Sequence, residues 1–214
     1  KGRTTWHLSE IEKFWTQAEV ELGINSDELN AASVLSHARR DSPPDTIVTT
    51  EAGVYGRVSL YAWKVYGPLT YFDSSGANTM GFSIPAALGA SLARPEQKTV
   101  CLVGDSGFLM RASELETAAR CGLSPVIIIF DDGTLGMIRI KQKAKGYARD
   151  GVDLAQTNFA QLAQSFGGNG WEVRTMSEFT NAFRKALDSD KLSVIDVRID
   201  PDEYAGHIKP IRGI

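Results

Sequence analysis

The chain has 214 residues, of which 43% are hydrophobic, and a formal net charge of −3 at pH 7. This length and apolar content suffice for one buried α/β domain with a peripheral extension, and the slight negative charge excludes a broad nucleic-acid surface, which needs clustered Lys and Arg. No apolar run reaches the ~20 residues that a membrane span requires, so we expect neither nucleic acid nor a membrane as a partner.

Helical spacing of apolar residues predicts two helices at the start of the chain. Residues 9–22 place Ile11, Phe14 and Trp15 on one helical face, and residues 29–40 repeat the pattern until the run DSPPD breaks it. The chain begins without Met, in what looks like the middle of a longer polypeptide. We therefore interpret residues 1–42 as a helical lead-in from a preceding domain.

From residue 43 onward, short apolar runs alternate with amphipathic segments. Residues 51–80 have weak periodicity and predict long loops around one helix. The runs predict strands at 46–50, 98–104, 125–131, 170–175 and 192–199, and helices at 82–92, 112–122, 158–167 and 177–189. The alternation predicts an α/β domain over residues 43–200, with helices on both faces of a mainly parallel sheet, followed by a mobile tail at 201–214.

The two cysteines lie inside apolar runs, TVCLVG and AARCGL. We interpret Cys101 and Cys121 as small buried hydrophobic residues rather than a disulfide or redox pair, which fits a reducing cytoplasm. His7, His37 and His207 are far from any motif and are interpreted as surface or packing residues.

Two neighbouring strands of the predicted sheet end in acidic residues, GDS at 104–106 and DDG at 131–133. Because ligands bind where parallel strands deliver their carboxyl ends, we expect Asp105 and Asp132 to converge there. Few protein oxygens around a hard cation, with positions left for water and phosphate, are typical of magnesium sites. The residues alone leave helix caps or solvated loop carboxylates as an equal alternative.

Further residues of the same turn suit a phosphate group beside such a cation. Gly104 and Gly107 would let the backbone approach phosphates closely, and a helix beginning near Ala112 would present free N–H groups with its positive dipole end. A dinucleotide-binding domain is discounted, because GxGxxG does not follow the first strand.

Three segments resemble the diphosphate-binding domain of thiamine-diphosphate enzymes of the acetolactate synthase and pyruvate oxidase type. The family signature is GDG followed, one βα unit later, by NN. Here GDS at 104–106 and FDDGTLGMIR at 130–139 stand in these places. The resemblance implies that Asp105 and Asp132 bind Mg²⁺ through their carboxylates and Thr134 through its carbonyl, with two diphosphate oxygens and a water completing the octahedron.

The other two segments lie upstream. NTMGFSIPAALGA at 78–90 is similar to the family's GTMGFGLPAAIGA, which implies that Met80 props the cofactor in its bent form and that backbone groups of Asn78 and Met80 bind the aminopyrimidine. TEAG at 50–53 is similar to the family's TDVG or AETG turn beside the diphosphate. The thiamine-diphosphate-binding fold and the following cofactor-binding residues are therefore implied: Glu51, Gly53, Asn78, Met80, Gly104, Asp105, Ser106, Gly107, Asp132, Thr134, Gly136 and Met137.

Departures from the family pattern concern charge and specificity. Asp132 replaces the metal-binding Asn and adds negative charge beside an anionic diphosphate. The run RIKQK, with Arg139, Lys141 and Lys143, either offsets this charge or forms a solvated helix face, and we prefer the second interpretation. Lys141 stands where acetolactate synthases commonly carry Trp, so substrate specificity stays open.

The resemblance implies a thiamine-diphosphate- and magnesium-dependent enzyme that decarboxylates 2-oxo acids and transfers the resulting acyl-carbanion equivalent, as acetolactate synthase does. In this family the activating Glu lies on a separate pyrimidine-binding domain, so no catalytic residue is assigned here and the chain should be inactive alone. We expect that domain, from the same or another chain, as a partner within a homo-oligomer. The alternatives are a 2-oxo acid decarboxylase or oxidase of the same family, or a non-catalytic cofactor-binding module.

Overall fold

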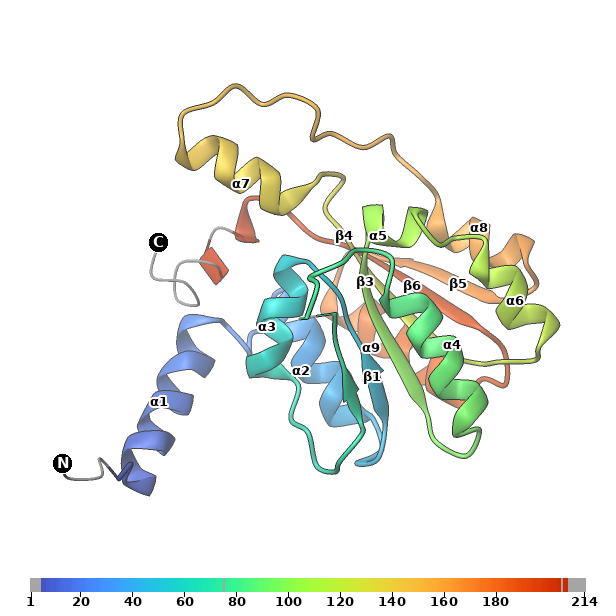
Figure 1. Cartoon of the computed structure of the whole chain (residues 1–214), viewed down its shortest axis with the longest axis horizontal. Helices are drawn as coiled ribbons and strands as arrows, with labels where there is room; N and C mark the ends of the chain where they lie inside the picture. Colours follow the sequence, from blue (N-terminus) through green and yellow to red (C-terminus); the bar gives the residue numbers. More distant parts are fainter. Residues whose placement is uncertain (1–4, 75, 205, 208–214) are drawn as a thin grey trace.

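A six-stranded sheet organises the part of the chain that the computed structural model describes, residues 5–74, 76–204 and 206–207 (Figure 1). Every neighbouring pair of strands in this sheet is parallel, which confirms the predicted α/β fold with a parallel sheet. From one edge to the other the strands are β2 (Tyr71–Phe72), β1 (Ile47–Thr49), β3 (Thr99–Gly104), β4 (Val126–Asp131), β6 (Ser193–Arg198) and β5 (Asn169–Val173).

Helices cover both faces of the sheet and bury one apolar cluster on each. On one face lie α2 (Ala31–Asp41), α3 (Val54–Ala62) and α9 (Met176–Asp188), and on the other α4 (Ser83–Ala93), α5 (Asp105–Leu109), α6 (Glu114–Arg120) and α8 (Phe159–Ser165). The central strands β3 and β4 are buried along their whole length, as their continuous apolar runs predict. The fold is therefore the expected three-layer sandwich.

The two N-terminal helices pack differently. Val34, Leu35 and Ala38 of α2 are fully buried in the core, whereas α1 (Leu8–Glu21) projects from the domain and buries Ala18 alone (Figure 1). Phe14 and Trp15 stay 54% and 42% exposed, and Trp15 meets Tyr61 of α3 edge to face. The interpretation of residues 1–42 as a lead-in from another domain stays a prediction.

Three local features of the structure differ from what the sequence predicts. The helix expected at 112–122 is present as α6, which begins two residues later at Glu114, but the short helix α5 directly after β3 is not predicted, and Ala112 lies in the turn between the two. The segment 51–80 contains the edge strand β2, which is too short to produce a visible pattern. Cys121 is exposed, because α6 ends there and the chain turns at Gly122, whose φ is +64°.

The segment after β6 returns to the carboxyl edge of the sheet. Tyr204 is 2% exposed, and His207 is buried as a packing residue, which lowers its pKa. Of the tail predicted to be mobile, residues 205 and 208–214 lie outside the described residues. No helix in the described ranges is both long and apolar enough to cross a membrane.

Gly170 in β5 marks a backbone contact that tolerates no side chain. A Cβ there would overlap the carbonyl group of Ala160 in α8. Because the overlapping atoms belong to the helix backbone, they cannot move away by a change of side-chain rotamer. We expect Gly170→Ala to lower the free energy of unfolding by about 3 kcal/mol, measured by urea denaturation. Gly89→Ala in α4 is the matched control, because a Cβ there meets nothing and alanine favours a helix by about 1 kcal/mol. Equal stability of the two variants would contradict the prediction.

Candidate functional site

A cleft opens at the carboxyl edge of the sheet, between the start of α3, the β3–α5 turn, the loop from β4 to α7 (Gly136–Ala144) and Tyr204. Its location is the one that the strand order predicts. Most of the predicted site residues line it: Gly53, Met80, Gly104, Asp105, Ser106, Gly107, Asp132, Thr134, Gly136 and Met137. Glu51 and Asn78 lie instead in an adjoining hollow that shares Gly53 with the cleft.

Asp105 occupies the first position after β3 and is 4% exposed. Its Oδ1 accepts the backbone N–H of Ser106 at 2.6 Å, while Oδ2 is buried and finds no hydrogen-bond partner among the described residues. Burial raises the pKa of Asp105 to about 8, with the charge of Asp132 as the next cause. A buried carboxylate with an unused oxygen is costly unless a cation compensates it.

The loop after β4 holds Asp132 in a fixed orientation. Oδ1 accepts both the backbone N–H of Thr134 at 2.7 Å and its hydroxyl at 2.9 Å. The loop itself is tied down on both sides of Thr134, because Leu135 donates its N–H to Val152 and Leu154 donates to the carbonyl of Gly133. Burial raises the pKa of Asp132 to about 6, against the effect of the Thr134 hydrogen bonds.

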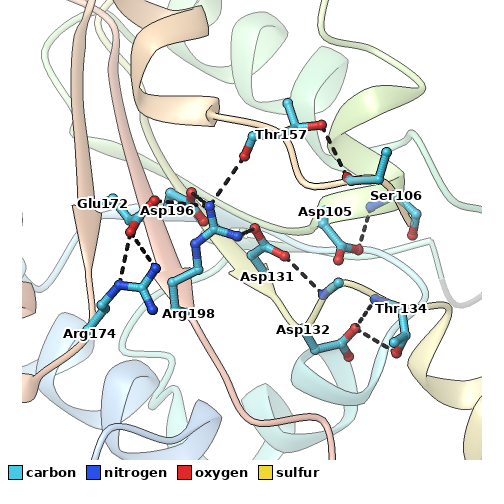
Figure 2. Close-up of polar contacts among 12 residues, drawn as sticks. Asp105, Ser106, Asp131, Asp132, Thr134, Thr157, Glu172, Arg174, Asp196 and Arg198 are labelled. Atoms are coloured by element: carbon cyan, nitrogen blue, oxygen red, sulfur yellow. Dashed lines mark hydrogen bonds and ion pairs between the residues drawn. The ribbon is translucent and has the colours of Figure 1, made fainter. Parts of the chain in front are cut away.

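The two carboxylates fit a hard divalent cation. They lie in one region of the cleft (Figure 2), and burial raises the pKa of both. Oδ2 of Asp105 has no hydrogen-bond partner among the described residues and is free to bind a cation. Oxygen donors of this kind are those that Mg²⁺ prefers. Within the described ranges no group of three or more His, Cys, Asp or Glu side chains is placed to hold a metal by itself. Two carboxylates therefore need further oxygens from a neighbouring carbonyl, a ligand or water.

Two glycines of the turn make room for neighbouring side chains. A Cβ on Gly107 would overlap Oε1 of Glu51, and a Cβ on Gly104 would lie 3.2 Å from the ring of Tyr55. From the sequence, the predicted role of these glycines is a close approach of phosphate. The structure adds a second reason for them, which is the tight packing of Glu51 and Tyr55 beneath the turn.

Glu51 and Asn78 have clear structural roles. Oε2 of Glu51 accepts the backbone N–H and the hydroxyl of Ser83, both at 2.9 Å, and so ties the end of β1 to the start of α4. Asn78 adopts φ +52°, a left-handed conformation that Asn tolerates better than most side chains. Gly adopts it readily, and Gly is the residue at this position of the family segment GTMGF. A direct cofactor contact of either residue stays a prediction.

The aromatic and ionic surroundings of the site are not predicted from the sequence. Tyr55 stacks on Phe130 with ring centres 4.9 Å apart, and Tyr204 has a pKa raised first by burial and then by the charge of Asp132. Asp131 pairs with Arg198 of β6. Tyr55 follows the predicted TEAG turn by two residues and could have been suspected, whereas nothing in the tail or in the strand LSVIDVRI marked Tyr204 or Arg198.

The basic residues of α7 have two interpretations from the sequence, either a solvated helix face or compensation for the negative charge of the cleft, and each interpretation holds for some of them. Lys141 and Lys143 are exposed, as a solvated face requires. Arg139 is half-buried, its Nη2 lies 2.9 Å from Oδ1 of Asp202, and its charge lowers the pKa of Asp132. Arg139 therefore offsets part of the negative charge in the cleft.

The fold and the cleft define an α/β domain of the class that carries its ligand site at the carboxyl edge of a parallel sheet, between two acidic strand ends. The family described as "Thiamine pyrophosphate enzyme, C-terminal TPP binding domain" matches residues 51–197. The chain belongs to this family and represents its C-terminal cofactor-binding domain.

Relatives agree with this assignment. The chain is 33% identical over 168 residues to a probable acetolactate synthase large subunit of Methanococcus aeolicus, covering 78% of this chain and 28% of the relative. It is 30% identical over 194 residues to the acetolactate synthase of Bacillus subtilis, covering 90% and 34%. Among solved structures, the thiamine diphosphate-dependent 4-hydroxybenzoylformate decarboxylase of Rhodococcus jostii superposes with a TM-score of 0.75 at 30% identity, covering 82% and 33%. The chain thus spans about a third of the length of these relatives.

Proposed function

We propose that the chain binds thiamine diphosphate together with Mg²⁺, as part of an acetolactate-synthase-like enzyme that decarboxylates a 2-oxo acid and transfers the acyl-carbanion equivalent to an acceptor. The observation that carries this proposal is the buried pair Asp105 and Asp132, with Oδ2 of Asp105 unused, inside the cleft of a domain from the thiamine pyrophosphate family. The carboxylates of both residues and the carbonyl of Thr134 would hold the cation.

Other residues of the cleft would bind and orient the cofactor. Gly53, the turn from Gly104 to Gly107 and Gly136 would approach the diphosphate, and Met80 would support the bent form, with Asn78 and Met80 backbone groups at the aminopyrimidine. Thiamine diphosphate, when bound, supplies the carbon nucleophile that attacks the 2-oxo group. Apolar residues beside the acidic pair, Phe130 and Met137 among them, would keep water from that end of the cleft.

A pyrimidine-binding domain is the proposed partner, from the same or another chain, within a cytoplasmic homo-oligomer. The relatives are about three times longer than this chain, which leaves room for such a domain. Leu109, Met110 and Ile138 are exposed apolar side chains near the cleft, and a partner domain could cover them. Because the activating Glu is expected on that domain, this chain should be inactive by itself.

A decarboxylase is the second candidate. The solved relative from Rhodococcus jostii is a decarboxylase, and Lys141 stands exposed where acetolactate synthases commonly carry Trp. An oxidase or a non-catalytic cofactor-binding module are the remaining alternatives. Analysis of the products formed from a 2-oxo acid separates these candidates. A synthase gives a condensation product, a decarboxylase an aldehyde, an oxidase an oxidised acid, and a non-catalytic module no product.

The proposal is tested by calorimetric titration of the assembled protein with thiamine diphosphate, with Mg²⁺ and with EDTA. We expect binding that requires Mg²⁺ and that Asp105→Ala weakens by about 100-fold or more, because a direct ligand matters more than the outer-shell partners whose loss costs 10- to 100-fold. Glu116→Gln, which removes an exposed carboxylate of α6, is the control and should bind as the unmodified protein does. Metal-independent binding, or none, would refute the proposal.

A further inference from the structure

The two acidic residues at the end of β4 face different surroundings. Successive side chains of an extended strand point to opposite sides, and Figure 2 shows Asp131 directed toward Arg198 while Asp132 turns toward Thr134. Asp132 lines the cleft, whereas Asp131 is 5% exposed and lines only the cavity behind it, which Asp105 and Asp132 also reach. The structure therefore gives different partners to two neighbouring carboxylates that the sequence leaves equivalent.

Arg198 holds Asp131 from the position directly opposite. The two residues are register partners in the parallel pairing of β4 with β6, and Nη1 of Arg198 forms an ion pair with Oδ2 of Asp131. The second oxygen, Oδ1, accepts the backbone N–H of Gly133 at 3.0 Å. Both oxygens of Asp131 are thus engaged, one by β6 and one by the loop that carries Asp132.

The guanidinium of Arg198 also pairs with two further carboxylates. Its Nη2 lies 3.0 Å from Oε2 of Glu172 and 3.1 Å from Oδ2 of Asp196, and it also donates to the carbonyl of Thr157 at 3.3 Å. The side chain of Arg198 is 16% exposed, so its pairings are screened little by water. Arg174 meets Glu172 from the surface, with 63% of its side chain exposed.

Packing alone would not keep Asp131 in place. A cavity of about 300 Å³ adjoins the acidic loop, and its lining includes Asp105, Asp131, Asp132 and Arg198. Asp131 already lies beside Asp105, whose pKa it raises as a lesser cause after burial and the charge of Asp132, so an Asp131 released from Arg198 would bring an uncompensated charge to the two carboxylates at the cleft. It would then compete with Asp132 for a cation and repel a diphosphate.

We propose that Arg198 is a positioning residue of the metal and diphosphate site, which holds Asp131 as an internal ion pair so that Asp132 alone of the two acidic residues is presented to the cation. This inference rests on the proposed function. It explains how an Asp-Asp pair serves where the family carries Asn-Asn, since a buried carboxylate is tolerated when a well-placed cation pairs with it. Arg198 acts through Asp131 and touches neither cofactor nor substrate.

The test is a set of binding titrations on the assembled protein, with thiamine diphosphate at saturating Mg²⁺. We expect Arg198→Met to weaken binding by about 10- to 100-fold, the range for partners of metal ligands. Adding Asp131→Asn should restore the affinity to within about threefold of the unmodified protein, because the released charge is gone. Asp131→Asn alone should bind nearly normally, and Arg174→Met, which removes a surface arginine of the same network, should have no effect.

Rescue separates positioning from a merely structural role. Asp196 and Glu172 lose Arg198 equally in the single and the double variant, so a structural role predicts that both bind poorly. If Arg198→Met does not fold, Arg198→Lys takes its place, since Lys keeps the charge without the forked geometry, and Asp131→Asn must again restore its affinity. Normal binding by the Arg198 variants, or no rescue, overturns the inference alone. Failure of the unmodified protein to bind overturns the proposed function and the inference with it.

Discussion

Replacing Asp105 by Asn is expected to weaken Mg²⁺-dependent binding of thiamine diphosphate strongly and, at the same time, to make the free protein more stable. Asp105 is buried beside Asp132, and burial together with that neighbouring charge raises its pKa to about 8. At neutral pH the free protein therefore carries a carboxyl group whose ionised form the fold opposes. An uncharged amide of the same shape removes this opposition, but it also removes the negative charge that attracts the cation and leaves only a neutral oxygen as a weaker ligand.

The direction of the pH effect follows from the raised pKa. The folded protein holds the proton of Asp105 up to about pH 8, whereas the unfolded chain releases it near the ordinary value of 3.8. The contribution of this group to stability is therefore complete below about pH 4 and is lost as the pH rises to about 8. Asp132, with its pKa raised to about 6, adds a smaller loss in the same direction between about pH 4 and 6.

Denaturation of the free protein between pH 5 and 8 measures this effect. At about 1.4 kcal/mol for each pKa unit, we expect Asp105→Asn to exceed the unmodified protein by a few kcal/mol in unfolding free energy at pH 8, and by less at pH 5. With Mg²⁺ and thiamine diphosphate added, the order should reverse, because the cation binds the unmodified protein much more tightly and so stabilises it more. A variant that is less stable than the unmodified protein at pH 8 without ligand would contradict this account.

The sequence predicted the parts of the fold that rest on periodicity. The strands at 98–104 and 125–131 are continuous apolar runs, and the structure buries both at the centre of the sheet, so the convergence of Asp105 and Asp132 followed from strand order alone. Short or edge elements escaped, because β2 has only two residues and gains its pairing from β1. The short helix α5 escaped for a similar reason, since a five-residue helix has no periodic pattern.

Residues of the site that depend on tertiary contact could not be predicted. Arg198 ends a strand whose alternation says nothing of a partner 67 positions away, yet the pairing of β4 with β6 places it opposite Asp131. Tyr204 reaches the cleft only because the chain turns back after β6. The contacts around the acidic pair therefore depend on strands that are far apart in the sequence and adjacent in the sheet, and no local sequence pattern reveals them.

Replacing Gly107 by Ala is the second substitution with a large expected effect. A Cβ at this position would overlap Oε1 of Glu51 and lie 3.3 Å from a methyl group of Val103. Glu51 is 4% exposed and is held through Oε2 by two hydrogen bonds from Ser83, so it cannot turn aside without leaving these buried donors unpaired. We expect a loss of about 3 kcal/mol in unfolding free energy, at the upper end for an over-packed core, measured by chemical denaturation of the free protein.

Two further changes at Glu51 show whether the overlap is the cause. Glu51→Gln keeps the shape of the side chain, so the effect of Gly107→Ala should persist in that background. Glu51→Ala removes the overlapping atoms, although it leaves Ser83 without its acceptor and is destabilising by itself. The double variant Gly107→Ala, Glu51→Ala should therefore be more stable than the sum of its two changes predicts, by about 2 kcal/mol, as expected for residues in direct contact. Strict additivity would show that Gly107 is required for another reason, such as the approach of a phosphate to the turn.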